Sequence, residues 1–380
     1  MSQLNSLKPI LEFGSTNIRL ALYNDKIVNK NLFYEKKIRL NSNQSSNENH
    51  PVFDLIMKAE AEVGQHLNEL TLVLDSSSVH SLEFSIQQKY EKKIVNQNDL
   101  DYLINESKQI IKSFNQEKDI LHIIISNIFF DNKNVVNNEI KSQAVNKATI
   151  ELKFILIDKK NFESVKKLLL KKHISITNIY CASYIKSLGL IKKLEIYGNS
   201  AFIDIGHNKS SLLIFENNKL KYLNNTHIGG NHITKDISKI LKIDYRKAEA
   251  EKLKFSKKSK SELSSADSDL LKKIINSRLE EIIELLFFNC PLFQNKILQK
   301  DLNLYFIGNG SKVLNKNFLT FGPDFNFISE MSIIDELKKD CCDSALRFDI
   351  NTEKIQPKKT DLVIENKGFF EKLFEYLSKK

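Results

Sequence analysis

Two glycine-containing turns carry the residue types that can hold a phosphate group. They are Gly14-Ser15-Thr16-Asn17 and Asp204-Ile205-Gly206-His207-Asn208, and each follows an apolar strand and leads into another. A glycine lets the backbone approach a phosphate closely, and the hydroxyls and amides of the first turn can donate hydrogen bonds to its oxygens. Glu12 and Asp204 stand where a carboxylate can orient a magnesium-bound water. One such turn is more typical of a plain hairpin, whereas two matched turns predict a phosphate clamp.

Three further segments can complete a nucleotide site. Gly229-Gly230-Asn231 begins a predicted helix, where free amides and the positive end of the helix dipole attract phosphate or ribose. Glu251 and Lys254 are three residues apart on a predicted helix and share a face, where one can accept from a ribose hydroxyl and the other can contact the base. Gly308-Asn309-Gly310-Ser311 follows a buried strand, at whose end α/β folds bind ligands. Taken alone, the first segment is equally typical of a loop, the second of a solvated helix face and the third of an ordinary turn after a strand.

The elements that must position these segments occur twice. Residues 9–40 read as a β-meander with the first turn between its first two strands, and residues 200–223 repeat the same order of strand, turn, strand and hairpin. Two copies predict an internally duplicated fold. Between them, residues 83–157 predict a β/α insert with a helix at 99–114, N-capped by Asn98, and a loop that holds Asp131.

Length and composition exclude several classes. At 380 residues the chain exceeds one ordinary core, so at least two lobes are expected. The net charge is +10, but only five of the 57 basic residues are arginine, and we expect no nucleic-acid partner. The four cysteines form no CxxC pair, which predicts neither a zinc site nor a disulfide framework and indicates a reducing, cytosolic compartment. No apolar stretch reaches the roughly eighteen residues of a membrane span, so any membrane contact is expected to be peripheral.

The last fourteen residues, 367–380, read as a separate amphipathic helix after a polar linker. Its large apolar side chains fall at helical offsets that build one stripe, namely Phe369, Phe370, Leu373, Phe374 and Leu377. Basic side chains, which include Lys372, Lys379 and Lys380, outnumber the two acidic ones. Such a helix is expected to lie in the interface of an anionic membrane. The alternative is a helix that packs on the protein's own core.

Taken in order, these segments resemble the phosphate-1, phosphate-2 and adenosine motifs of the actin-like ATPases, and specifically those of the FtsA family of bacterial cell-division proteins. The run at 250–254 is similar to the Ala-Glu-x-x-Lys signature of that family, residues 179–183 are similar to its connecting segment, and residues 275–285 resemble the helix before its adenosine turn. The resemblance implies a duplicated, ribonuclease H-like, two-lobed α/β fold that binds ATP with Mg²⁺. In this reading Glu12 and Asp204 reach the metal through water.

The resemblance also implies a division into subdomains. Residues 8–82 and 158–197 correspond to subdomain IA, with a return at 331–350, and residues 83–157 correspond to the inserted 1C subdomain, which is SHS2-like. Lobe II is expected at 198–330, with a reduced subdomain IIB at about 242–275. A linker at 351–366 and a membrane-targeting helix at 367–380 follow.

The sequence departs from the family pattern at the phosphate turns. Glu12 stands where most of the superfamily has Asp, and His207, Asn208 and Lys209 replace the small residues of the phosphate-2 run. The added side chains occupy space that close backbone approach requires, and Lys209 is expected to offset phosphate charge. We therefore expect ATP binding with weak or no hydrolysis, and the sequence identifies no catalytic residue.

The family resemblance implies an adaptor that polymerises on the cytoplasmic face of the bacterial inner membrane, at the division site, and tethers FtsZ there. In this reading FtsZ docks on subdomain IIB, later division proteins contact the 1C insert, and the chain associates with itself and with anionic lipid. One alternative is a pilus-assembly relative of FtsA. Another is a small-molecule kinase of the same superfold, which needs a general base for which the sequence shows no clearly placed aspartate.

Overall fold

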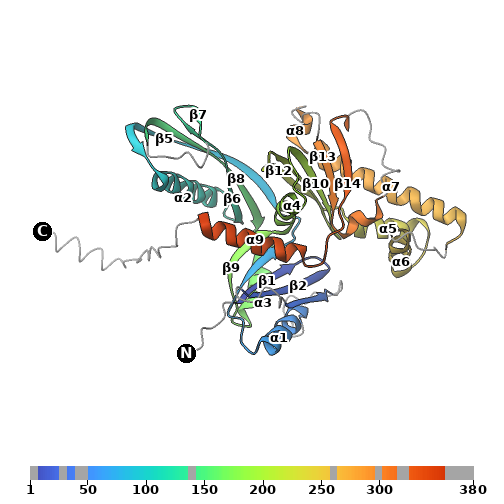
Figure 1. The fold of residues 1–380 in the computed structure, drawn as a ribbon. Coiled ribbons are helices and arrows are strands. Elements are labelled where there is room, and N and C mark those ends of the chain that lie inside the picture. The colour runs from blue at the N-terminus through green and yellow to red at the C-terminus, as the bar shows by residue number, and fades with distance from the viewer. Residues whose placement is uncertain are drawn as a thin grey trace.

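Three β-sheets organise the protein into three lobes (Figure 1). The computed structural model describes residues 7–24, 32–38, 50–135, 143–256, 263–295, 302–314 and 325–355. Each sheet belongs to a separate cluster of buried apolar side chains. Two sheets have five strands and one has four.

Lobe I is built on a sheet of order β3-β2-β1-β4-β9. Its strands are β1 (Leu7–Phe13), β2 (Asn17–Asn24), β3 (Leu32–Lys37), β4 (Glu69–Leu74) and β9 (Ser175–Cys181). The first three are antiparallel, and β4 and β9 run parallel to β1. Central strands of this kind are covered on both faces, which explains their continuous apolar runs. The covering helices are α1 (Pro51–Val63), α3 (Lys159–Leu170), α4 (Ala182–Lys193) and α9 (Asp340–Ile355).

Lobe II repeats this topology with the order β12-β11-β10-β13-β14, so the predicted duplication is confirmed. Its strands are β10 (Asn199–Ile205), β11 (Ser210–Glu216), β12 (Lys219–Thr226), β13 (Leu302–Ile307) and β14 (Ile328–Ile333). Asn217 and Asn218 both have positive φ, 48° and 65°, as the tight β11–β12 hairpin requires. The helices are α5 (Gly230–Ile240), α6 (Tyr245–Ser256), α7 (Ser265–Phe288), α8 (Pro291–Gln294) and the 3₁₀ helix η2 (Asn309–Val313).

The insert between the two copies of the unit is a sheet of order β5-β8-β6-β7 covered by α2 (Gln97–Phe114). Its strands are β5 (His80–Val95), β6 (Lys118–Phe130), β7 (Lys133–Asn134) and β8 (Gln143–Asp158). The helix starts earlier than predicted, because Asn96 rather than Asn98 is the N-cap. The Asn96 side chain accepts from the amides of Asn98 and Asp99, and Asp99 accepts from the amide of Asn96. This reciprocal capping box places the start of the helix.

The insert contacts both other lobes. Toward lobe II, the buried Lys153 ammonium donates to the carbonyl of Lys221 and pairs with Glu83 at 2.7 Å. Toward lobe I, the His122 ring on β6 accepts a hydrogen bond from the amide of Cys181, at 2.9 Å from Nε2. The insert therefore rests on the two sheets whose turns form the candidate site.

Several predicted boundaries differ from the observed ones. Helix α9 extends through Ile355, five residues into the range predicted as a linker, and the predicted tail helix lies outside the described residues. Helix α7 begins at Ser265, because the Ser264 hydroxyl accepts from the Asp267 amide and caps the helix. The predicted IIB range holds α6 and the first part of α7, and no strand occurs among its described residues, 242–256 and 263–275.

Candidate functional site

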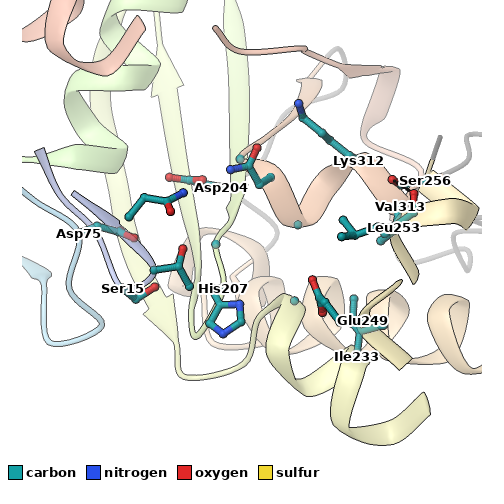
Figure 2. Close-up of a pocket in the computed structure, with 18 of the residues that line it drawn as sticks. Ser15, Asp75, Asp204, His207, Ile233, Glu249, Leu253, Ser256, Lys312 and Val313 are labelled. Atoms are coloured by element: carbon teal, nitrogen blue, oxygen red, sulfur yellow. Dashed lines mark hydrogen bonds between the residues drawn. The ribbon is translucent and has the colours of Figure 1, made fainter. Parts of the chain in front are cut away.

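A cavity of about 750 Å³ lies between lobes I and II (Figure 2). The β1–β2 turn and Asp75 border it from lobe I, and the β10–β11 turn, α5, α6 and η2 border it from lobe II. Its volume falls in the range of small-molecule and cofactor sites.

The structure brings most of the predicted glycine turns to this cavity. The predicted residues that line it are Glu12, Gly14, Ser15, Thr16, Asn17, Asp204, Gly206, His207, Gly230, Gly308, Asn309 and Gly310. The predicted residues that do not line it are Asn208, Lys209, Gly229, Asn231, Glu251, Lys254 and Ser311.

The two phosphate-type turns have the same internal hydrogen bond. The amide of Gly14 donates to the carbonyl of Asn17 at 3.0 Å, and the amide of Gly206 donates to the carbonyl of Lys209 at 2.9 Å. Both turns thus close three residues after the glycine, as expected for two copies of one unit. The side chain of His207 lies at the cavity between Ser15 and Glu249 (Figure 2). Burial lowers the pKa of His207, so its imidazole is neutral at pH 7.

The amides of the Gly229–Asn231 segment are not available to a ligand, which corrects the expectation from the sequence. The amides of Gly230 and Asn231 donate to the carbonyls of Gly206 and His207 at 2.9 and 2.8 Å. The start of α5 therefore braces the second turn. Gly229 is required for this contact, because a Cβ there would lie 2.8 Å from three backbone atoms of that turn.

Helix α6 turns a different face to the cavity from the one predicted. Glu251 and Lys254 do share a face, and their side chains pair at 2.9 Å, but Glu251 is only 1% exposed. The face that lines the cavity consists of Tyr245, Glu249, Lys252, Leu253 and Ser256. Counted from Glu249, the others lie four residues before it and three, four and seven residues after it, which is one helical stripe, and residues 251 and 254 fall outside it.

Lys209 is also placed differently from the prediction. Its side chain is buried, and its ammonium lies 2.8 Å from the Asp75 carboxylate and 3.0 Å from the Ser211 hydroxyl. Burial alone would lower the pKa of Lys209, but the Asp75 carboxylate outweighs it and raises that pKa. The ammonium is therefore charged, and it forms an ion pair between lobe II and lobe I instead of pointing into the cavity.

The two remaining predicted residues that do not line the cavity, Asn208 and Ser311, form hydrogen bonds within or next to the turns. Asn208 is exposed, and its side-chain oxygen accepts from the Asn231 side chain at 3.0 Å. Ser311 is fully buried, and its hydroxyl donates to the Gly308 carbonyl at 2.7 Å. Gly308 has a φ of 84°, which an L-residue rarely adopts.

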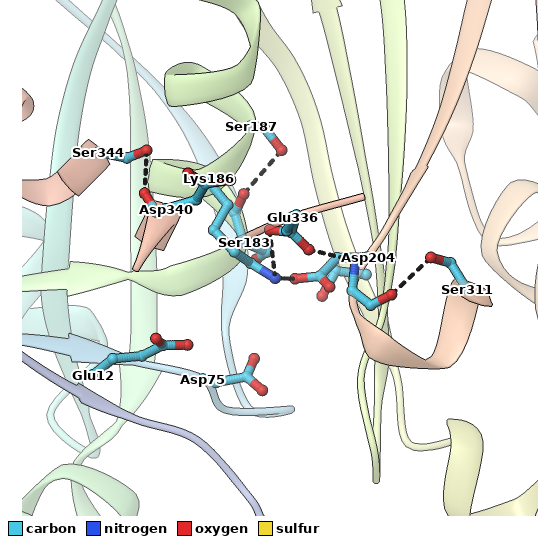
Figure 3. Close-up of polar contacts among 12 residues, drawn as sticks. Glu12, Asp75, Ser183, Lys186, Ser187, Asp204, Ser311, Glu336, Asp340 and Ser344 are labelled. Atoms are coloured by element: carbon cyan, nitrogen blue, oxygen red, sulfur yellow. Dashed lines mark hydrogen bonds and ion pairs between the residues drawn. The ribbon is translucent and has the colours of Figure 1, made fainter. Parts of the chain in front are cut away.

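The two carboxylates proposed for metal binding are both paired with basic side chains. The Arg19 guanidinium donates to the two Glu12 oxygens at 2.9 and 3.0 Å. The Lys186 ammonium on α4 lies 2.6 Å from Asp204 and 3.7 Å from Glu336 (Figure 3). Burial would lower the pKa of Lys186, but these two carboxylates raise it well above its ordinary value.

Sequence reasoning missed Arg19, Asp75 and Lys186. Asp75 had a usable signal, because it follows β4 as Gly308 follows β13 in the duplicated unit. Arg19 also had one, since it alternates with apolar residues on β2, and its cross-strand partner in the β1–β2 register is Glu12. Lys186 had none, because a lysine on a predicted helix reads as a solvated residue.

The cavity has the surfaces that a nucleotide requires. Apolar side chains on the lobe II side include Ile233, Leu253, Val313 and Ile333, and the β1–β2 turn with Ser15 borders the cavity from lobe I (Figure 2). An apolar wall opposite a polar turn suits a ligand with a flat base at one end and charged groups at the other. The residues present therefore fit a nucleotide.

The same residues do not fit a magnesium ion. Mg²⁺ takes free carboxylate oxygens and waters in an octahedron, whereas both oxygens of Glu12 and one oxygen each of Asp75 and Asp204 have a cationic group within 3.0 Å. Among the residues that the structure describes, no cluster of three His, Cys, Asp or Glu side chains is arranged to hold a metal.

Comparisons with known proteins agree with this architecture. Residues 201–365 match the family model described as "Cell division protein FtsA". The cell-division protein FtsA of two strains of Helicobacter pylori is 25% identical over 139 residues, which is 37% of this chain. The match covers 28% of the length of those relatives.

Solved structures show likeness over nearly the whole chain. The PilM-PilN type IV pilus biogenesis complex aligns with a TM-score of 0.58 and 12% identity, over 93% of this chain and 99% of that one. MreB 5 of Spiroplasma citri bound to AMPPNP aligns with a TM-score of 0.48 and 13% identity, over 92% and 98%. At such identities the likeness concerns the fold alone.

The duplicated five-stranded sheets and the cavity between them define an actin-like ATPase fold with an inserted β/α lobe. Within this fold class, residues 201–365 are similar to the cell-division protein FtsA. Among the described residues, no helix is both long and apolar enough to cross a membrane.

Proposed function

We propose that this protein is an ATP-binding, actin-like cell-division adaptor that polymerises on the inner membrane and tethers FtsZ there. The observation that carries the proposal is the cavity between the duplicated lobes, bordered by both glycine turns, in a chain whose second half matches the FtsA family model. In this proposal the polyphosphate lies between Ser15, Thr16 and His207, and the base lies against Ile233 and Leu253.

Hydrolysis is expected to be weak or absent. The Gly230 and Asn231 amides are already bonded to the carbonyls of the second turn, and Lys209 is bonded to Asp75. Few groups of that turn are left to stabilise charge that develops on a transferring phosphate. Nucleotide then serves as a structural ligand that favours the closed arrangement of the lobes and, through it, assembly.

Membrane attachment is assigned to residues 367–380. Five large apolar side chains that each gain about 1 to 1.5 kcal/mol by partial burial give a gross of about 5 to 7 kcal/mol before helix ordering is subtracted. One copy therefore binds weakly, and a filament that presents many copies holds through avidity.

The test is ATP-dependent co-sedimentation with anionic liposomes, for the full chain and for a variant that lacks residues 367–380, with FtsZ added in a second arm. We expect the full chain to pellet with liposomes, more so with ATP, and to carry FtsZ with it, and the shortened chain to remain in solution at unchanged melting temperature. A shortened chain that still pellets, or one that loses folding stability, argues for a tail that packs on the core.

The pilus-assembly alternative is favoured by one observation, the alignment with the PilM-PilN complex. An adaptor of that kind is expected to recruit its membrane partner through a peptide. Liposome binding by the purified chain alone favours the division adaptor, and failure to bind liposomes together with capture of a peptide ligand favours the alternative.

A further inference from the structure

Three carboxylates line the cavity, and each already pairs with a cation of this chain. The pairs are Glu12 with Arg19, Asp204 with Lys186, and Asp75 with Lys209. The N···O distances are 2.9, 2.6 and 2.8 Å, which are those of charge-assisted hydrogen bonds. The carboxylates of Glu12 and Asp204 are nearly inaccessible to solvent, so their charge has to be met from within the protein.

The three cations are held in place by further contacts. The Arg19 guanidinium also donates to Glu35 at 2.9 Å. Lys186 has Glu336 as a second partner, and Figure 3 shows its ammonium directed at both carboxylates. Lys209 donates to Ser211 at 3.0 Å. Displacing any of the three cations would break contacts with two partners, and this costs free energy.

Two of the pairs join parts of the chain that close on the cavity. Asp75 follows β4 of lobe I, and its partner Lys209 lies in the β10–β11 turn of lobe II. Lys186 stands on α4, which covers lobe I, and its partner Asp204 lies on β10 of lobe II. In a metal-dependent site, a divalent ion and its waters would stand among such carboxylates and bridge the lobes.

The charge balance of the cavity supports the same conclusion. The acidic side chains that line it are Glu12, Asp75, Asp204, Glu249 and Asp335, and the basic ones are Arg19, Lys37, Lys186, Lys252 and Lys312. Five acids and five bases sum to a formal charge of zero, and the buried Lys209 adds one positive charge beside them. An anionic ligand therefore enters without a divalent ion to neutralise the protein's own carboxylates.

The geometry points to a nucleotide site that works without a divalent metal, in which Arg19, Lys186 and Lys209 take the place of Mg²⁺. This inference rests on the proposed nucleotide site. It goes beyond that proposal because it concerns which groups neutralise the carboxylates of the site and connect the two lobes. A divalent ion placed near Asp204 would face the Lys186 ammonium at close range, and the two positive charges would repel each other.

The experiment is calorimetric titration of ATP into the full chain, once with excess Mg²⁺ and once with excess EDTA. We expect dissociation constants that agree within about threefold, because the metal adds no contact to the protein. Binding that appears with Mg²⁺ and is lost by about tenfold or more in EDTA overturns the inference and leaves the nucleotide site standing. Absence of binding in both conditions overturns the nucleotide site and, with it, this inference.

A variant series tests the role of the ammonium on α4. Lys186→Gln frees the Asp204 and Glu336 carboxylates, so ATP binding in EDTA is expected to weaken by about tenfold and to be restored by Mg²⁺. Lys186→Arg keeps the charge and is expected to restore binding in EDTA. The matched control is Lys193→Gln, on the same helix but half-exposed and paired with Asp340, which is expected to bind ATP as the unmodified protein does in both conditions.

The melting temperature of each variant shows whether it folds. If Lys186→Gln does not fold, the comparison of Mg²⁺ with EDTA in the unmodified protein and in Lys186→Arg still decides the question. A Lys186→Gln protein that folds and binds ATP equally well with and without metal contradicts the assignment of Lys186.

Discussion

The buried histidine at the base of the insert predicts a pH dependence of folding stability. His122 is fully surrounded, with Tyr180, Tyr184 and Phe348 against its ring at centroid distances of 5.4, 4.9 and 5.6 Å. Burial lowers the pKa of His122 to about 3, and its Nε2 accepts a hydrogen bond from the Cys181 amide. The ring is therefore neutral in the folded protein, and protonation would both charge it and remove the acceptor.

The sign of the effect follows from where the proton binds. Below a pH of about 6.5, the unfolded chain protonates this histidine and the folded chain does not, so the free energy of unfolding falls as the pH falls. The stability due to the neutral ring is fully present above that value and is lost progressively toward the folded-state pKa of about 3. A shift of this size corresponds to about 5 kcal/mol in total, of which about 2 kcal/mol is lost between pH 7 and pH 5.

The assay is urea unfolding, followed by circular dichroism at pH 7, 6 and 5. His122→Gln keeps a side-chain acceptor but has no proton to gain, so its free energy of unfolding is expected to fall by about 2 kcal/mol less than that of the unmodified protein over this range. The matched control is His227→Gln, which replaces an exposed histidine and is expected to follow the unmodified profile. Parallel profiles for His122→Gln and the unmodified protein would refute the reasoning.

Three further substitutions test the elements that shape the site. Gly308→Ala is expected to cost about 2 kcal/mol or more and to lower the melting temperature, because its φ is 84° and a Cβ would lie 2.4 Å from an Asp204 oxygen; an unchanged melting temperature would contradict this. Gly229→Ala places a Cβ 2.8 Å from three backbone atoms and is expected to cost about 1 to 3 kcal/mol and to weaken ATP binding, as differential scanning fluorimetry with and without ATP will show. Leu279→Ala in the buried face of α7 is expected to lower the free energy of urea unfolding by about 2 to 5 kcal/mol with ATP affinity retained, and a loss of affinity at unchanged stability would speak against a purely structural role.

The family model and the structural alignment cover different parts of the chain. The family model covers the second lobe and α9, whereas the structural alignment with the PilM-PilN complex extends over the insert and the first lobe as well. The duplicated topology joins the two findings, because the first lobe repeats the strand order of the lobe that the family model recognises.

Local patterns in the sequence were enough to predict the duplicated fold. The runs that became β1, β2, β10 and β11 are apolar and end in glycine or asparagine turns, and both signals act within a few residues of the chain. The same holds for the helix of the insert, which was predicted to within two residues although its N-cap was assigned to Asn98 rather than Asn96. Patterns that span only a few residues determine which strands and helices form and where the chain turns between them.

Only the tertiary structure decided which charges meet. Lys209 pairs with Asp75, 134 positions earlier, and Lys186 on a helix of lobe I reaches Asp204 on a strand of lobe II. The sequence likewise placed Glu251 and Lys254 on one face of α6 but could not tell that this face is turned from the cavity, because helical spacing determines which residues lie together and not the rotation of the helix on its neighbours. Contacts of this kind depend on how whole lobes close on one another, and the burial that results decides whether a charged side chain meets a ligand, a metal or another residue of the chain.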